Sequence, residues 1–389
     1  MPDYAQNAID IADIAPRLER SNVLVTGGTG FLGGRLVERL LTECGARPRV
    51  MLRSYGRAAA LARFGLERIT LIRGDLRDRQ SLASAVEGCS IVFHCAVDRG
   101  DRQSNISGIE ALIAACIRHK ARLVHVSTFG VYEPLRDGDL DESITPVHSG
   151  IRYSDMKLDI DAKVLEAVQT GALDAVIILP TIVYGPYAKP WTLYPASQLA
   201  SGTVVLPEYG GGLCNAVYVD DVCQGMLRAA VVPLARGRRY LVSGPEPVSW
   251  VAFYRSIADA IGRPGPRLAS TDELKHGDAN PLTAIKLLLR DPKRVTRWGP
   301  IHDLAQWAKP RLSPSGKARL KQLYGLYRRH APPPIYTPNA QLMALFRARC
   351  RVKIDRAISD LGYRPAFDFA RGMAITSEWL RWTLHPEEK

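Results

Sequence analysis

The sequence lacks long apolar stretches: no run in its 389 residues approaches the roughly 20 that a membrane-spanning helix needs. The N-terminus from Met1 to Arg20 has early acidic residues and no apolar core, so it does not resemble a secretory signal. None of the 7 cysteines forms a CxxC pair, which argues against a zinc ribbon and a disulfide framework. We therefore expect a cytoplasmic protein with free, buried thiols and no metal site.

The positive charge is concentrated in one stretch of the chain. Of the net charge of +13, residues 286–353 carry +14, with 16 Lys or Arg against Asp291 and Asp303, so the rest is nearly neutral. Aromatic side chains such as Trp298 and Tyr324 are interleaved with these cations. Such a segment can form a basic lid over a substrate cleft, bind an acidic partner, or contact a membrane surface peripherally, and these alternatives stay open. No nucleic-acid motif accompanies the charge, so we expect no nucleic-acid partner.

Apolar runs of strand type alternate with helical patterns along the chain. Strands are predicted at residues 22–25, 49–52, 69–72, 90–94, 122–126 and 175–179, and helices at 8–20, 35–41, 106–119 and 369–384. This alternation predicts an α/β fold, in which a doubly wound parallel sheet carries helices on both faces.

A glycine-rich turn lies between the first predicted strand and the helix that follows it. Gly27, Gly30 and Gly33 form the pattern G-x-x-G-x-x-G, which permits a tight turn and a close backbone approach. The helix N-terminus that follows offers unpaired N–H groups and a partial positive charge to a pyrophosphate. The turn therefore predicts a dinucleotide-binding site.

The sequence TGGTGFLG at 26–33 resembles the signature of the extended short-chain dehydrogenase/reductases. The resemblance continues through RGDL at 73–76, HCA at 94–96, Asn105, VSTFGVY at 126–132, YSDMK at 153–157, PTIVYGP at 180–186, NAVYVDDV at 215–222 and KIDRAISDLGYRP at 353–365. It implies a Rossmann-type NAD(P)-binding domain over 21–180, with 215–245 returning to it. An N-terminal helical extension (1–20) would precede it. A smaller, partly helical substrate-binding domain would comprise 181–214 and 246–389, including the basic insertion 286–353.

The resemblance also implies the site residues and a homodimer. The catalytic set would be Thr128, Tyr153, Lys157 and Asn105. The cofactor would be bound by Gly27, Gly30, Phe31, Leu32, Gly33, Arg53, Asp75, Leu76, Cys95, Ala96, Tyr153, Lys157 and Pro180.

The chemistry of two of these residues supports their roles. Tyr153 and Lys157 are four residues apart, so on a helix they share one face. An adjacent ammonium favours the phenolate form of a tyrosine. Tyr153 can then pass a proton to or from a substrate oxygen that Thr128 also binds, while hydride moves at carbon.

The end of the second predicted strand bears on the choice of cofactor. NAD-binding chains usually place an acidic residue there for the ribose hydroxyls, whereas this chain has Arg53, with Arg57 close behind. A guanidinium suits a 2′-phosphate, which favours NADP(H), and NAD(H) stays open as the alternative.

Two departures from the family pattern bear on the small-molecule substrate. Nucleotide-sugar members commonly carry Asn where this chain has Ile182, and Arg where it has Asn215. The region from Pro338 to Tyr363 resembles the 3β-hydroxysteroid and sterol dehydrogenase branch. We therefore predict an NAD(P)-dependent oxidoreductase acting on a secondary alcohol or ketone of a bulky, hydrophobic, sterol-like substrate. The alternatives are a nucleotide-sugar epimerase, dehydratase or reductase with retained NAD(P), and a non-catalytic cofactor-sensing protein.

Overall fold

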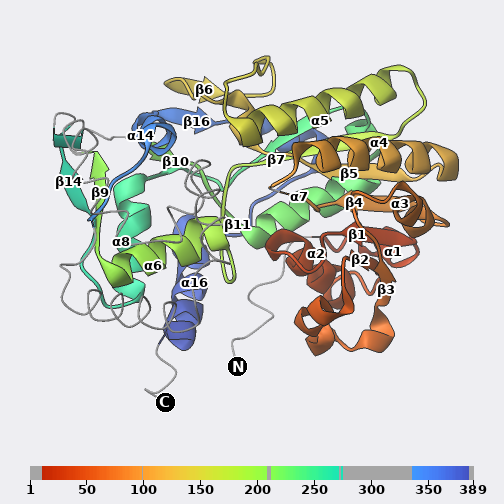
Figure 1. The fold of residues 1–389 in the computed structure, drawn as a ribbon, viewed down its shortest axis with the longest axis horizontal. Helices are drawn as coiled ribbons and strands as arrows, with labels where there is room; N and C mark the ends of the chain where they lie inside the picture. Colours follow the sequence, from red (N-terminus) through yellow and green to blue (C-terminus); the bar gives the residue numbers. More distant parts are fainter. Residues whose placement is uncertain (1–10, 99, 208–211, 271–272, 275–334, 385–389) are drawn as a thin grey trace, which may run out of the picture.

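A seven-stranded parallel sheet forms the centre of the protein in the computed structural model, which describes residues 11–98, 100–207, 212–270, 273–274 and 335–384. The strands follow the spatial order β12-β7-β5-β4-β1-β2-β3 (Figure 1). Their bounds are β1 Val23–Thr26, β2 Arg49–Leu52, β3 Thr70–Arg73, β4 Ile91–His94, β5 Arg122–Val126, β7 Ala175–Pro180 and β12 Arg239–Val242. The predicted doubly wound α/β fold is confirmed, and β12 is a strand that the sequence analysis did not predict.

Helices cover both faces of this sheet (Figure 1). On one face α4 packs between α3 and α5, and on the other α2 packs against α7. Their bounds are α2 Phe31–Thr42, α3 Arg79–Val86, α4 Arg102–His119, α5 Arg152–Gln169 and α7 Val219–Val231. The strand order reverses between β1 and β4, and ligands of such sheets bind at the carboxyl ends of the strands that flank this reversal.

Several predicted helix boundaries were wrong. The helix expected at 8–20 is the short α1, Ala15–Glu19, whose first turn contains Pro16, a position that suits proline; residues 1–10 lie outside the described part. The helix expected at 35–41 starts earlier, at Phe31. The helix expected at 106–119 starts at Arg102, because Asp101 caps it by accepting a hydrogen bond from the Ser104 backbone N–H at 3.1 Å.

A smaller lobe lies beside the carboxyl edge of the sheet (Figure 1). Its strands are β8 Ile182–Tyr184, β9 Thr203–Pro207, β10 Leu213–Cys214, β11 Ala216–Tyr218, β13 Val248–Ser249, β14 Arg267–Ala269 and β15 Ile335–Tyr336. Its helices are α6 Tyr194–Ser201, α8 Trp250–Ala260, α14 Ala340–Arg347 and α16 Phe369–Leu384. The final helix was predicted with these bounds, and that prediction is confirmed.

Short elements complete the described chain. Strand β6 (Gly138–Leu140) pairs with β16 (Cys350–Val352), which α15 (Asp355–Leu361) follows. The short 3₁₀ helices are η2 Tyr55–Ala60, η3 Ala62–Phe64, η4 Leu66–Arg68, η5 Phe129–Tyr132 and η7 Pro233–Ala235. The segment η6, Lys189–Leu193, is a short π-helix. Within the described ranges, no helix is long and apolar enough to span a bilayer. Residues 286–334, most of the basic segment, lie outside those ranges.

Candidate functional site

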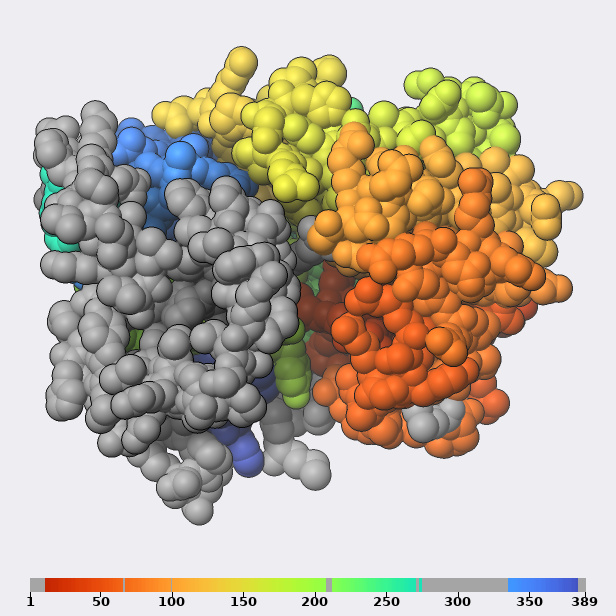
Figure 2. Space-filling view, viewed as in Figure 1, coloured from red at the N-terminus to blue at the C-terminus, as the bar shows by residue number. Residues whose placement is uncertain are grey.

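A large cavity opens at the carboxyl ends of β1, β4, β5 and β7, and continues into the smaller lobe. Figure 2 shows the surface hollowed along one edge of the orange N-terminal half, with red residues from the start of the chain deeper inside. The cavity volume is 2310 Å³, more than twice the upper end of the roughly 300–1,000 Å³ usual for one small-molecule site. It therefore has room for a dinucleotide and a second ligand side by side.

Nearly all the predicted site residues line this one cavity. Those that do are Gly27, Gly30, Phe31, Leu32, Gly33, Arg53, Asp75, Leu76, Cys95, Ala96, Thr128, Tyr153, Lys157 and Pro180. They come from seven separate stretches of the chain, so only the tertiary fold brings them together.

The glycine-rich turn has no space for side chains. Gly27 has a φ of 71°, a left-handed conformation that favours glycine, and a Cβ there would lie 2.7 Å from the backbone nitrogen of Ala96. A Cβ on Gly33 would lie 2.4 Å from the carbonyl oxygen of Gly27. The N-terminus of α2 therefore borders the cavity with bare backbone, which fits the pyrophosphate of a dinucleotide.

The predicted catalytic side chains lie together on the wall formed by β5 and α5. Thr128 follows the end of β5, and its Oγ1 accepts a hydrogen bond from the Gly130 N–H at 3.2 Å. Lys157 is buried, and its Nζ donates to the carbonyl oxygen of Val126 at 2.8 Å. Tyr153, one turn earlier on α5, is 39% exposed. A tyrosine, a threonine hydroxyl and a buried ammonium group thus line the same wall of the cavity.

Asn105 is placed apart from these residues, because it does not line the cavity. Its Nδ2 donates to the carbonyl oxygens of Asp98 and Asp101, each at 2.6 Å, and its Oδ1 accepts from the Asp98 N–H at 2.9 Å. The buried amide therefore fixes the loop between β4 and α4.

The far end of the cavity, beyond the glycine turn, carries positive charge. Arg53 and Arg57 both line it. The Arg53 guanidinium is half exposed and lies 3.9 Å from a carboxylate oxygen of Asp98, which Arg77 also binds at 2.7 Å. Arg53 and Arg57 thus add two guanidinium groups to this end of the cavity.

The smaller lobe lines the other end of the cavity with apolar rings that the sequence analysis missed. Tyr187, Trp191, Trp379 and Trp382 all border it, and the Tyr187 and Trp379 rings lie 4.9 Å apart. Tyr187 has a φ of 69°, which is unusual for a bulky side chain and turns its ring toward α16. No periodicity relates these residues in sequence, so no local pattern could have grouped them.

One half-buried carboxylate, Glu133, faces this apolar end and was also missed. Its Oε2 accepts hydrogen bonds from Ser154 Oγ at 3.0 Å and from Gln341 Nε2 at 3.3 Å. Burial raises the pKa of Glu133 above its ordinary value. Because Ser154 is the neighbour of Tyr153, Glu133 links the catalytic wall to α14.

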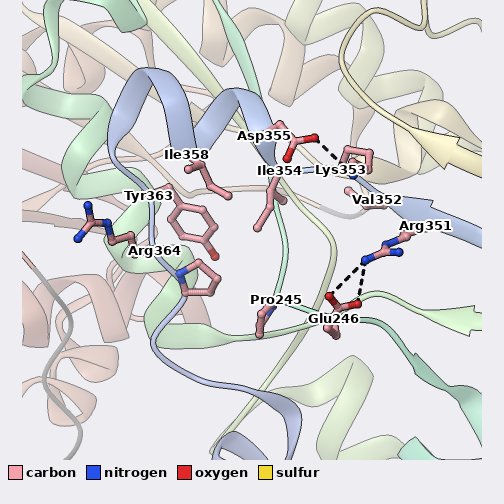
Figure 3. A pocket seen from close by; sticks show the side chains of 11 residues that line it. Pro245, Glu246, Arg351, Val352, Lys353, Ile354, Asp355, Ile358, Tyr363 and Arg364 are labelled. Atoms are coloured by element: carbon pink, nitrogen blue, oxygen red, sulfur yellow. Dashed lines mark hydrogen bonds and ion pairs between the residues drawn. The ribbon is translucent and has the colours of Figure 1, made fainter.

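A second hollow, of 420 Å³, lies between β16, α15 and the loop after β12 (Figure 3). The charged side chains around it bind one another: Arg351 pairs with Glu246 at 3.0 Å and Lys353 with Asp355 at 3.5 Å. The Tyr363 hydroxyl donates to the Ser243 carbonyl oxygen at 2.8 Å. Its main polar groups are thus used within the protein, and we assign it no ligand.

The chain is similar to known proteins, and residues 23–242 match a family described as the NAD dependent epimerase/dehydratase family. Sterol demethylase protein B of Methylococcus capsulatus is 33% identical over 69% of this chain and 81% of its own length. A 2-alkyl-3-oxoalkanoate reductase of Shewanella oneidensis is 28% identical over 63% and 67%, respectively. A dTDP-glucose 4,6-dehydratase of an Actinoplanes species is 28% identical over 66% and 87%.

Solved structures share the fold at lower identity. An epimerase from Methanothermobacter thermautotrophicus superposes with a TM-score of 0.68, at 16% identity and with 97% of each chain covered. A dTDP-glucose 4,6-dehydratase from Streptomyces venezuelae with NAD bound gives a TM-score of 0.64, at 22% identity, covering 92% of this chain and 97% of its own.

Proposed function

The chain belongs to the NAD-dependent epimerase/dehydratase family, and within it we propose an NAD(P)-dependent oxidoreductase acting on a secondary alcohol or ketone of a bulky, hydrophobic substrate. The family match confirms the predicted resemblance to the extended short-chain dehydrogenase/reductases. One observation carries the proposal: a single cavity joins the glycine turn, the Thr128–Tyr153–Lys157 wall and an aromatic end.

The proposed mechanism assigns one task to each side chain on the wall. A nicotinamide cofactor, when bound, supplies the redox chemistry at the substrate carbon. In the direction of ketone reduction, the Tyr153 hydroxyl gives its proton to the substrate oxygen, and the Thr128 hydroxyl donates a hydrogen bond to the same oxygen. The buried ammonium of Lys157 favours the phenolate that Tyr153 becomes.

The aromatic end of the cavity supports a hydrophobic substrate. Its flat apolar rings suit an alicyclic or long-chain ligand better than a diphosphate, which needs several cations. Asn215 is buried and does not line the cavity. Its Nδ2 donates to the Cys350 carbonyl oxygen and its Oδ1 accepts from the Val352 N–H, both at 2.9 Å. Ile182 lines the cavity with an apolar side chain. Two relatives named as a sterol demethylase protein and an oxoalkanoate reductase agree with this substrate class.

The second candidate is a nucleotide-sugar enzyme with retained NAD(P). Relatives and structural neighbours named as dTDP-glucose 4,6-dehydratases favour it. A non-catalytic cofactor sensor is the third candidate, and the convergence of Thr128, Tyr153 and Lys157 on one wall argues against it, because sensing alone needs none of them.

One experiment separates the candidates. The nucleotide content of freshly purified protein is measured in the supernatant after denaturation, and empty protein is titrated with NADPH and NADH. Reversible cofactor binding, followed by turnover of an alicyclic ketone or sterol, supports the oxidoreductase. Stoichiometric retained NAD(P) with turnover of a dTDP- or UDP-sugar overturns it in favour of the second candidate. Failure to bind either nucleotide removes all three.

We also propose that the cofactor is NADP(H), because Arg53 lines the end of the cavity where the adenosine ribose of a dinucleotide bound at the glycine turn would lie. Arg53→Asp is expected to lower the affinity for NADPH relative to NADH by about tenfold or more, since a charged hydrogen bond to the 2′-phosphate is replaced by repulsion. Fluorescence titration with both cofactors measures the ratio. Arg118→Asp, on the exposed end of α4, is the control for the same charge change. A ratio equal to that of the control shows that Arg53 does not bind the cofactor.

Two proposals concern partners. A homodimer, as the family resemblance implies, would place α5 in its contact, which sedimentation of the purified protein tests. Peripheral membrane contact through 286–353 rests on the charge of that segment, since most of it lies outside the described residues.

A further inference from the structure

A buried cluster of titratable side chains lies directly behind Lys157. Tyr153, Lys157 and Asp161 follow one another at intervals of four residues, so they project from one face of α5. Asp161 is 1% exposed and His125, on β5, is fully buried. Buried charged groups are rare in proteins unless they are paired or serve a function.

The contacts within this cluster are incomplete. Ser127 Oγ donates to Asp161 Oδ2 at 2.7 Å, but among the described residues Asp161 Oδ1 has no hydrogen-bond partner. This oxygen lies 3.4 Å from Nε2 of His125, and within the same part of the chain neither ring nitrogen of His125 forms a hydrogen bond. The His94 ring stacks on His125 with 5.4 Å between centroids, and its Nδ1 lies 2.9 Å from the hydroxyl of Thr26, the residue before the glycine turn. The cluster thus runs from the catalytic helix to the base of the cofactor site.

The electrostatics of the two central groups are complementary. Burial raises the pKa of Asp161 to about 7, while the positive charges of Lys157 and Arg239 act in the opposite direction. Burial and the charge of Lys157 lower the pKa of His125. Within the pair the proton therefore resides on Asp161, which titrates near neutral pH, and the His125 ring beside it stays neutral.

A purely structural role does not require this carboxylate. A group whose pKa is raised on folding binds its proton more tightly in the folded state. The free energy of unfolding therefore falls as the pH rises from the unfolded pKa, near 4, towards about 7. Asparagine has the same shape, accepts the Ser127 hydrogen bond and avoids this loss. The chain nevertheless has an ionisable carboxyl group at this position, and its negative charge interacts with the positive charge of Lys157.

We propose that Asp161, which lies beside the His125 ring, is a positioning residue that supplies the buried counter-charge of Lys157 and sets the electrostatic potential at the nicotinamide end of the cavity. This inference rests on the proposed function, since it assumes that a nicotinamide cofactor binds beside Lys157. The charged and titratable groups that face the pair are Lys157 of α5, His94 of β4, Arg239 of β12 and Tyr132 of η5.

The test uses the charge difference between oxidised and reduced cofactor. Oxidised nicotinamide is a cation and reduced nicotinamide is neutral, so a negative Asp161 favours the oxidised form. In the wild type, the ratio of the NADP⁺ and NADPH dissociation constants is expected to fall by about threefold or more between about pH 5.5 and about pH 8.5. In Asp161→Asn the ratio is expected to be independent of pH, and higher than wild type at the alkaline end.

Asp174→Asn is the matched control, because it removes a carboxylate at the opposite end of the sheet, where Asp174 pairs with Arg122 at 3.0 Å. It is expected to reproduce the wild-type pH dependence. A wild-type ratio that does not change with pH overturns the inference without any variant, as does an unchanged pH dependence in Asp161→Asn. Absence of any cofactor binding in the wild type instead contradicts the proposed function.

A second measurement serves if the variant does not fold. Carbon-13 NMR of aspartate-labelled wild-type protein follows the Asp161 carboxyl group directly. A carboxyl resonance that titrates near pH 7, with a midpoint that falls on NADP⁺ binding, supports the inference. A carboxyl resonance that is constant over the same pH range, or a midpoint that does not change on NADP⁺ binding, overturns it.

Discussion

Replacing Tyr153 with phenylalanine is expected to lower turnover of a ketone substrate by about 10²–10⁴-fold, the usual contribution of a positioned general acid. The ring that remains fills the same space on α5, and only the hydroxyl that gives the proton is lost. Because the glycine turn is the proposed site of the pyrophosphate, the dissociation constants for NADPH and NADH are expected to stay within about twofold of wild type. Steady-state kinetics and fluorescence titration measure the two effects separately.

The control for this prediction is Tyr194→Phe, which removes a hydroxyl from an exposed tyrosine that does not line the cavity. Its turnover and cofactor binding are expected to equal those of wild type. If Tyr153→Phe keeps turnover within a few-fold of this control, the general acid is another group. Glu133 is then the first residue to examine, because it lines the same cavity and accepts a hydrogen bond from Ser154, the neighbour of Tyr153.

Gly33→Ala is expected to weaken cofactor binding by about 100-fold and to lower the free energy of unfolding by about 2 kcal/mol. Gly33 lies in the first turn of α2, where alanine would otherwise favour the helix by about 1 kcal/mol. The added methyl group, however, would lie 2.4 Å from the Gly27 carbonyl oxygen, so the turn has to open. The backbone N–H groups then no longer converge on the pyrophosphate. Denaturant unfolding and NADPH titration measure the two quantities.

Gly56→Ala provides the control, because a Cβ at Gly56 meets no atom within 4 Å. This variant is expected to bind cofactor as wild type does and to be at least as stable. Wild-type cofactor affinity in Gly33→Ala would show that the turn does not form the dinucleotide site.

How well each feature of the protein can be predicted from its sequence depends on how far apart in the chain the interacting residues are. The glycine turn was predictable because its function depends on neighbours in sequence: a strand, three glycines at fixed spacing and a helix start. Tyr153 and Lys157 were predictable for the same reason, since four residues of helix bring both to one face. The boundaries of α1 and α4 were less predictable, because Pro16 and the Asp101 cap determine them and periodicity does not show either.

Other features depend on contacts between distant parts of the chain. Asn105 and Asn215 were read from family blocks, and the structure shows both amides bound to backbone groups that the fold brings beside them. Strand β12 is short and joins the sheet edge by pairing with β7. Asp161 and His125 are 36 residues apart in the numbering and meet only because α5 packs over β5.

The sequence by itself therefore determined the fold class, the glycine turn and the placing of Tyr153 and Lys157 on one helix face, since each is encoded in local spacing. Only the tertiary structure decided which residues surround the cavity and which lie behind Lys157. Tyr187 and Trp379 are far apart in sequence, yet their rings contact each other because β8 leads into the smaller lobe against which α16 packs. Contacts of this kind arise from packing across the whole chain, where hydrophobic burial is not directional and no short pattern records the partner.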